Sequence, residues 1–172
     1  MEAKVKIPNW PTEMVKLTES TYAYIQTKGT LGLSNAGLII GKDYAVLIDT
    51  LNSAPVASAF FTSVSQVTKK KVKYVLITHS HPDHIWGNHL MPEATVICHD
   101  KCYAEMEQMA RFNTEENKRI LTGDFSQVFS SLPEISFSNN MRLNLADKKV
   151  EQKSKPLCWE RSCDLAARPT IA

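Results

Sequence analysis

The stretch that decides the fold runs from Val72 to His84 and reads VKYVLITHSHPDH. Its first seven residues are an apolar run bounded by polar turn residues, which predicts a buried strand. The last six residues place three imidazoles and a carboxylate on the loop that follows. Buried polar groups need partners, so these four side chains cannot all point into an apolar core. In α/β folds, loops at the C-terminal ends of strands are where binding sites tend to lie.

A metal ion is the simplest reason to gather His79, His81, Asp83 and His84. Neutral imidazole nitrogens and carboxylate oxygens are ordinary zinc ligands, and a catalytic zinc site keeps one position open for water. In an extended loop, the spacing of His79 and His81 lets both rings face one ion. Asp83 and His84 could then reach a second ion or hold the attacking water. Bound zinc lowers the pKa of that water toward neutrality, so the loop predicts metal-dependent hydrolysis.

Two other interpretations compete with the metal site. The histidines could merely cap the following helix, which is the usual role of a single such histidine, but the full His-x-His-x-Asp-His pattern favours the metal. A serine or cysteine hydrolase is disfavoured because the chain has no Gly-x-Ser-x-Gly elbow, and Ser80 lies inside the histidine pattern.

The flanking segments predict an α/β order of elements. Val56, Phe60, Val64 and Val67 recur at helical spacing, with Ser53 as the cap and Pro55 in the first turn. The expected strands are Met14–Leu17, Tyr22–Gln26, Ser34–Ile40, Tyr44–Ile48, Val72–Thr78, Ala94–Cys98, Ile135–Phe137 and Met141–Leu145; the expected helices are Ala54–Lys69, a short one ended by Pro92, Asp100 to about Phe112, and Thr114 to about Gly123.

Length and composition predict one globular domain, with neither nucleic acid nor a membrane as its partner. The chain has 172 residues, 43% of them hydrophobic, and a formal charge of +2. This balance gives no reason to expect nucleic acid or membrane as a partner, and we interpret Lys69–Lys71 as charge at a helix C-terminus. No apolar run is long enough to span a bilayer, and residues 1–10 lack the apolar core of a secretory signal. We therefore expect a cytoplasmic protein that acts on a small-molecule substrate.

The four cysteines do not form a convincing disulfide framework. Cys98 and Cys102 lie on an expected strand and the helix after it, so we expect buried free thiols there. Cys158 and Cys163 could in principle serve as soft zinc ligands, but their spacing matches no common zinc knuckle.

The strand followed by His-x-His-x-Asp-His resembles the signature of the metallo-β-lactamase superfamily. The resemblance continues upstream through Ser34–Gly41 and Tyr44–Thr50, where paired strands end in an aspartate, and downstream through Ile85–Pro92 and Ala94–His99. It covers about Val15 to Val150. It implies an αββα sandwich and a zinc hydrolase that acts on an ester, thioester or amide, a β-lactam among them.

The resemblance also implies roles for individual residues. His79 and His81 would bind the first metal ion, and Asp83 and His84 the second. Asp83 would also act as the catalytic residue that positions or deprotonates the nucleophilic water, and Asp49 would orient the ligands from behind. One or two zinc ions are expected, with iron or manganese as other divalent metals that such a site can take.

The chain departs from the family pattern in its last third. Family members add a third histidine from a Gly-His-Thr stretch, then an aspartate and a last histidine, whereas this sequence has no histidine after His99 and no Gly-His pair. We therefore expect a partial domain at residues 1–150, with the C-terminal half incomplete, and a poorly ordered, non-homologous tail at 151–172. A frame disruption, an early stop or alternative splicing could produce that tail, and reading the coding DNA in all three frames would test the first.

Two functions remain open after this departure. One is the zinc-dependent hydrolase. The alternative is a truncated, catalytically deficient half-domain that binds metal weakly or acts only in association with another chain. A single half would expose sheet edges and apolar faces, which predicts a homo-oligomer.

Overall fold

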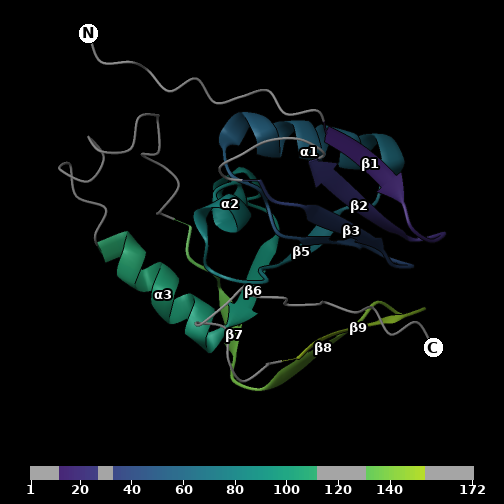
Figure 1. Ribbon diagram of the computed structural model, residues 1–172. Helices are drawn as coiled ribbons and strands as arrows, with labels where there is room; N and C mark the ends of the chain where they lie inside the picture. Colours follow the sequence, from purple (N-terminus) through teal and green to yellow (C-terminus); the bar gives the residue numbers. More distant parts are fainter. Residues whose placement is uncertain (1–11, 27–32, 112–130, 154–172) are drawn as a thin grey trace, which may run out of the picture.

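The computed structural model describes residues 12–26, 33–111 and 131–153. They form one mixed sheet with helices against one face and a two-stranded hairpin against the other (Figure 1). The α/β class expected from the sequence is confirmed.

The large sheet has seven strands in the order in which they occur along the chain. Neighbouring strands are antiparallel from β1 to β4 and parallel from β4 to β7. The parallel half places the C-terminal ends of β4, β5 and β6 at one edge, so the residues that follow β4 and β5 come together there. The strands are β1 (Thr12–Lys16), β2 (Thr21–Gln26), β3 (Ala36–Ile40), β4 (Ala45–Ile48), β5 (Val72–Leu76), β6 (Thr95–His99) and β7 (Ile135–Phe137).

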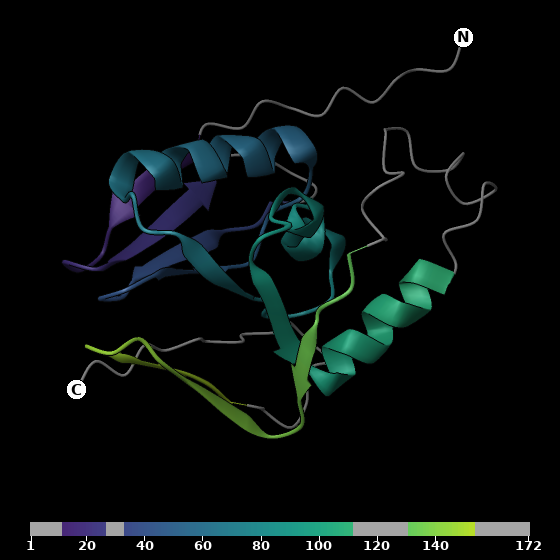
Figure 2. The same cartoon turned by 180° about the vertical axis from the view of Figure 1, so that it is seen from behind.

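Two helices cover one face of this sheet. In both views α1 (Ala54–Val67) lies over the β1–β2 side and α3 (Asp100–Arg111) lies beside β6 and β7 (Figures 1 and 2). Phe60 and Val64 of α1, and Cys102 and Met106 of α3, are buried in one core with the sheet residues that face them. Burial of such side chains is the main stabilising contribution to this layer. None of the helices in the described ranges has the length and apolar content that crossing a membrane requires.

The two ends of α1 show how far local sequence rules hold. Ser53 is the N-cap residue and Pro55 lies in the first turn, as expected, but the Ser53 hydroxyl makes no capping hydrogen bond. The Ser53 side chain is buried, and its Oγ has no hydrogen-bond partner. At the other end, Lys69 Nζ donates to the Ser65 carbonyl at 2.7 Å, as a cation near a helix C-terminus should.

The opposite face is covered in part by the hairpin of β8 (Asn140–Asn144) and β9 (Lys149–Lys153). Leu145 and Val150 are fully buried against Ile39, Val46 and other residues of the sheet. These strands form the second β layer of the sandwich. The end of β9 lies three residues beyond the boundary expected at residue 150, and the rest of the expected tail lies outside the described residues.

Other predicted elements agree with the structure within a few residues. The strand expected at Val72–Thr78 ends at Leu76, and the short helix before Pro92 is a helix, α2 (Pro82–Ile85), followed by a 3-10 turn, η1 (Asn88–Leu90). Cys98 and Cys102 are buried free thiols, as expected. The helix expected from Thr114 to Gly123 lies outside the described residues.

Candidate metal centre

The histidine loop lies at the edge of the sheet where the parallel strands end. His79 comes shortly after β5, and His81 has the extended backbone of an N-cap residue, with φ −61° and ψ 141°. Pro82 begins α2, which carries Asp83 and His84 on its single turn. The extended segment and the turn together fold the four predicted ligands toward one another.

The three imidazoles are in contact. The ring centroids of His79 and His84 are 4.0 Å apart, and those of His79 and His81 are 4.7 Å apart. Asp83 joins them, since its Oδ2 lies 3.5 Å from His84 Nε2. His81 is exposed, whereas the other three side chains are half-buried. The structure therefore brings all four sequence-predicted residues into one cluster open to solvent.

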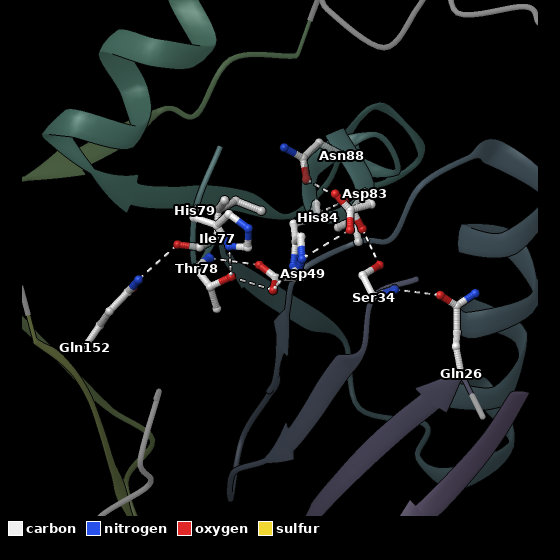
Figure 3. A network of polar contacts seen from close by, with 11 residues as sticks. Gln26, Ser34, Asp49, Ile77, Thr78, His79, Asp83, His84, Asn88 and Gln152 are labelled. Atoms are coloured by element: carbon white, nitrogen blue, oxygen red, sulfur yellow. Dashed lines mark hydrogen bonds and ion pairs between the residues drawn. The ribbon is translucent and has the colours of Figure 1, made fainter. Parts of the chain in front are cut away.

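Asp49 contacts this cluster through Thr78 and His84, as Figure 3 shows. Its carboxylate accepts hydrogen bonds from Thr78 N at 2.8 Å, from Thr78 Oγ1 at 2.7 Å and from His84 Nδ1 at 2.7 Å. These three donors compensate for the burial of the carboxylate, which is 3% exposed. They also offset the left-handed backbone of Asp49, whose φ is 58°.

The bond to Asp49 fixes which nitrogen of His84 is available. An ionised carboxylate only accepts hydrogen bonds, so Nδ1 of His84 carries the proton and Nε2 is left on the side of Asp83. A carboxylate bonded in this way to the far nitrogen of an imidazole is the usual arrangement behind metal-ligating histidines. Asp49 was expected behind the site, and the structure supplies the contacts.

The environment shifts the pKa values of two histidines in opposite directions. Burial, followed by the charge of His84, lowers the pKa of His79 and favours its neutral form. Burial also lowers the pKa of His84, but the hydrogen bond that His84 donates to Asp49 and the charges of Asp49 and Asp83 outweigh it, so the pKa of His84 is raised. Metal ligation requires neutral imidazole, and the lowered pKa of His79 meets that requirement near neutral pH.

Three further anchors that the sequence did not reveal hold the loop backbone. Ser34 Oγ donates to the Asp83 carbonyl, and Gln152 Nε2 donates to the Ile77 carbonyl at 2.9 Å (Figure 3). Thr50 N donates to the His84 carbonyl at 2.8 Å. They come from the segment before β3, from β9, and from the turn after β4. Their sequence separations of 49, 75 and 34 residues explain why no local pattern pointed to them.

A cavity of about 480 Å³ opens beside the cluster. Asp49, Thr78, His79 and His84 line one end of it. The rest follows the hairpin-side face of the sheet, and its lining includes Ala23, Gly37, Ile39, Ile48 and Val150. The cluster thus borders a largely apolar space.

The donor set suits zinc chemically, but the ligands do not form a closed site. Within residues 12–26, 33–111 and 131–153, no group of three or more His, Cys, Asp or Glu side chains is arranged so that it could hold a metal ion. The imidazole rings pack against one another, and the Nδ1 edge of His84 is taken by Asp49. The described residues therefore provide side chains whose chemistry suits zinc, in an arrangement that does not itself form a metal site.

The comparisons with known proteins concern the same part of the chain. The family model for the metallo-β-lactamase superfamily matches residues 29–114. Among curated proteins, none matches the sequence.

Two solved structures share the fold. A metallo-β-lactamase from Pontibacter korlensis superimposes with a TM-score of 0.63 at 18% identity, over 83% of this chain and 60% of that one. The DIM-1 metallo-β-lactamase, in a crystal structure described as exposed to ceftazidime, gives a TM-score of 0.59 at 15% identity, again over 83% and 60% of the two chains. This chain thus spans about 60% of the length of both structures.

The matched residues 29–114 make up half of the chain and include Asp49 and the whole His79–His84 loop. The fold and the position of that loop at the edge of the parallel strands agree with the match. The chain belongs to the metallo-β-lactamase superfamily.

Proposed function

We propose that the chain binds zinc through His79, His81, Asp83 and His84 and uses it in the hydrolysis of an ester, thioester or amide. The observation that carries this proposal is the contact of three imidazoles, with centroids 4.0 and 4.7 Å apart, at the sheet edge where Asp49 orients one of them. One or two ions fit the donor set, and iron or manganese are other candidates for the same ligands.

A zinc ion in this position would supply Lewis acidity and a bound water of lowered pKa. The chain's own residues have separate tasks. Asp49 keeps the proton on His84 Nδ1, so that Nε2 can act as a ligand. Asp83 projects its carboxylate toward the same side, at 3.5 Å from His84 Nε2, where it can orient a water molecule or accept its proton. The Ser34 hydroxyl, bonded to the Asp83 carbonyl, fixes the backbone from which that carboxylate projects.

Family membership and composition support a proposal for the substrate class. We propose a small molecule in the cytoplasm, with a β-lactam as one member of the class, and neither nucleic acid nor membrane as a partner. The cavity of about 480 Å³ beside His79 and His84 is large enough for part of such a molecule.

Zinc stoichiometry tests the proposal directly. The purified chain should take up one to two zinc ions, His81→Ala should lose most of this uptake, and His99→Ala should retain it. His99 is a suitable control because it lies on β6 with its Nε2 at 2.8 Å from the Ser138 carbonyl, outside the cluster. Equal uptake by the wild type and His81→Ala would refute the loop as the metal site. A panel of ester, thioester and amide substrates, assayed with and without zinc, would then test hydrolysis.

A second candidate is a half-site that binds metal weakly or only in association with another chain. It is favoured by the lack of a closed ligand set in the described residues and by the 60% coverage of the matched structures. In this case zinc uptake is sub-stoichiometric and hydrolysis is absent from the isolated chain. If a second copy completes the site, sedimentation should show dimers whose amount rises with zinc, whereas zinc-independent monomers would argue against association.

A further inference from the structure

Ser80 lies between His79 and His81 in the sequence, and its side chain points away from theirs. In an extended segment, neighbouring side chains point to opposite sides, so the side chain of Ser80 leaves on the side away from His79 and His81. It is 4% exposed, and its hydroxyl donates a hydrogen bond to Glu105 Oε2 on α3. The middle of the loop is thus joined to a helix that starts about 20 residues later.

The other hydrogen bonds that hold the loop lie at its two flanks. Asp49 binds Thr78 and His84, and Ser34 binds Asp83. These contacts hold the two flanks of the loop. The bond between Ser80 and Glu105 acts at the residue that sets the spacing between His79 and His81.

Helix α3 is a rigid support for this bond. Cys102 and Met106, on either side of Glu105 in the sequence, are buried in the core shared with β6. Their packing fixes α3 against the sheet, while Glu105 itself lies at the exposed rim of the helix. The Glu105 carboxylate accepts the hydrogen bond from Ser80, and hydrogen bonds to carboxylates are among the stronger ones in proteins.

We propose that Glu105 is a positioning residue for the metal loop, acting through Ser80 to set the relative placement of His79 and His81. This rests on the proposed zinc site, and it adds to that site a support from outside the histidine motif. Nothing in the local sequence around Glu105 distinguishes it from other acidic residues of α3, since its role depends on a partner 25 residues away.

The test compares zinc affinity in five variants of the full chain, measured by competition with a chromophoric chelator. Loss of a residue that orients a metal ligand typically lowers metal affinity by 10-fold to 100-fold, so Glu105→Ala and Ser80→Ala should each weaken zinc binding by about 10-fold. The double variant should be no weaker than either single variant, because both remove the same bond. Glu105→Gln should recover most of the affinity, since its amide oxygen still accepts a hydrogen bond. Gln108→Ala, on the exposed surface of the same helix, should behave as wild type.

A spectroscopic measurement separates positioning from general stability. With cobalt in place of zinc, the visible absorption of the bound ion reports ligand geometry, and it should change in Glu105→Ala but not in Gln108→Ala. Glu105 is exposed and alanine favours helix, so Glu105→Ala should fold even if Ser80→Ala does not. Wild-type affinity and an unchanged cobalt spectrum in Glu105→Ala would overturn the proposal.

Amide hydrogen exchange of the metal-free protein tests the support of the loop by Glu105 separately from zinc binding. Amides of residues 79–82 should exchange faster in Glu105→Ala than in wild type, whether or not zinc binds. If wild type takes up no zinc but the exchange differs, the zinc site fails and the support of the loop by Glu105 stands. If the exchange is identical in the two proteins, the positioning role fails.

Discussion

Asp49 Oδ2 lies 2.7 Å from His84 Nδ1, and this contact joins the end of β4 to the single turn of α2. The same carboxylate accepts the backbone N–H of Thr78, just beyond β5. One buried side chain therefore sets the positions of both flanks of the histidine loop. Its left-handed backbone, with φ 58°, turns the chain so that the carboxylate can reach both partners.

The contact between Asp49 and His84 should affect the pH titration of His84 in the metal-free protein. The pKa of His84 is raised from 6.5 because the bond and charge of Asp49 outweigh burial. A histidine whose pKa is raised on folding stabilises the protein fully below its unfolded pKa, and this contribution is lost as the pH rises through the folded pKa. NMR titration of the metal-free protein should give a His84 midpoint above 6.5, and Asp49→Asn should lower that midpoint.

The control for this titration is Asp147→Asn, which removes a carboxylate from the β8–β9 turn, where it accepts a hydrogen bond from Lys42 N at 2.8 Å. It should leave the His84 midpoint unchanged. A wild-type midpoint below 6.5 would mean that burial outweighs Asp49, contrary to the geometry described above.

Sequence patterns predicted the elements well because their causes are local. The apolar run from Val72 and the helical spacing of Phe60 and Val64 reflect burial of one face or of a whole strand, and each element formed within a few residues of its expected place. The grouping of the ligands also followed from local spacing, since His79 to His84 span only six positions.

The supports of the site could not be predicted in the same way. Ser34, Glu105 and Gln152 each contact the loop across 25 or more residues, so their roles exist only in the folded chain. Gln152 falls beyond residue 150, where the sequence had lost its resemblance to the family, yet it is buried and bonded to the strand that leads into the loop.

Gly87 should tolerate no larger residue, because the chain after α2 passes very close to the turn after β4. A Cβ at this position would lie 2.3 Å from the Thr50 carbonyl oxygen and 2.6 Å from Ala57 Cβ. Its φ of −84° suits any residue, so the expected cost comes from the clash alone. Gly87→Ala should lower the free energy of unfolding by about 3 kcal/mol in urea titrations.

Gly37→Ala is the matched control for this substitution. The added Cβ would meet Cβ and Cγ1 of Ile48 at 3.3 Å, a distance at which a side chain can shift slightly. It should cost clearly less than Gly87→Ala. Equal losses would show that the chain around Thr50 is more adaptable than its packing indicates.

The thiols of Cys98 and Cys102 should resist alkylation in the folded protein. Both are buried, and a hydrogen bond between the two thiols, together with burial, raises the pKa of the Cys102 thiol. Because the thiolate is the reactive form, iodoacetamide should modify these two residues only as fast as the protein opens. Mass spectrometry of a variant with Cys158→Ser and Cys163→Ser would measure this without interference. Rapid labelling under native conditions would contradict the burial of the pair.

Gln152 offers a pH-dependent test of the contact between β9 and Ile77, the residue just after β5. Its Nε2 donates to the Ile77 carbonyl, while its buried Oε1 has no hydrogen-bond partner. Gln152→Met removes the donor and the unpaired oxygen together and should cost about 1 kcal/mol. Gln152→Glu instead places an ionised carboxylate against a carbonyl oxygen, which should cost about 3 kcal/mol at neutral pH.

The sign of the pH effect follows from protonation of the introduced carboxyl. Burial raises the folded pKa of such a group, so the folded state binds more protons and the variant gains stability as the pH falls. Once protonated, the carboxyl can donate to the Ile77 carbonyl as the amide did. Urea titrations from about pH 7 to pH 5 should therefore bring Gln152→Glu closer to wild type. Lys153→Glu, at an exposed position of the same strand, controls for added negative charge. If both variants respond alike to pH, then Gln152 does not hold β9 against the strand that carries the histidine loop.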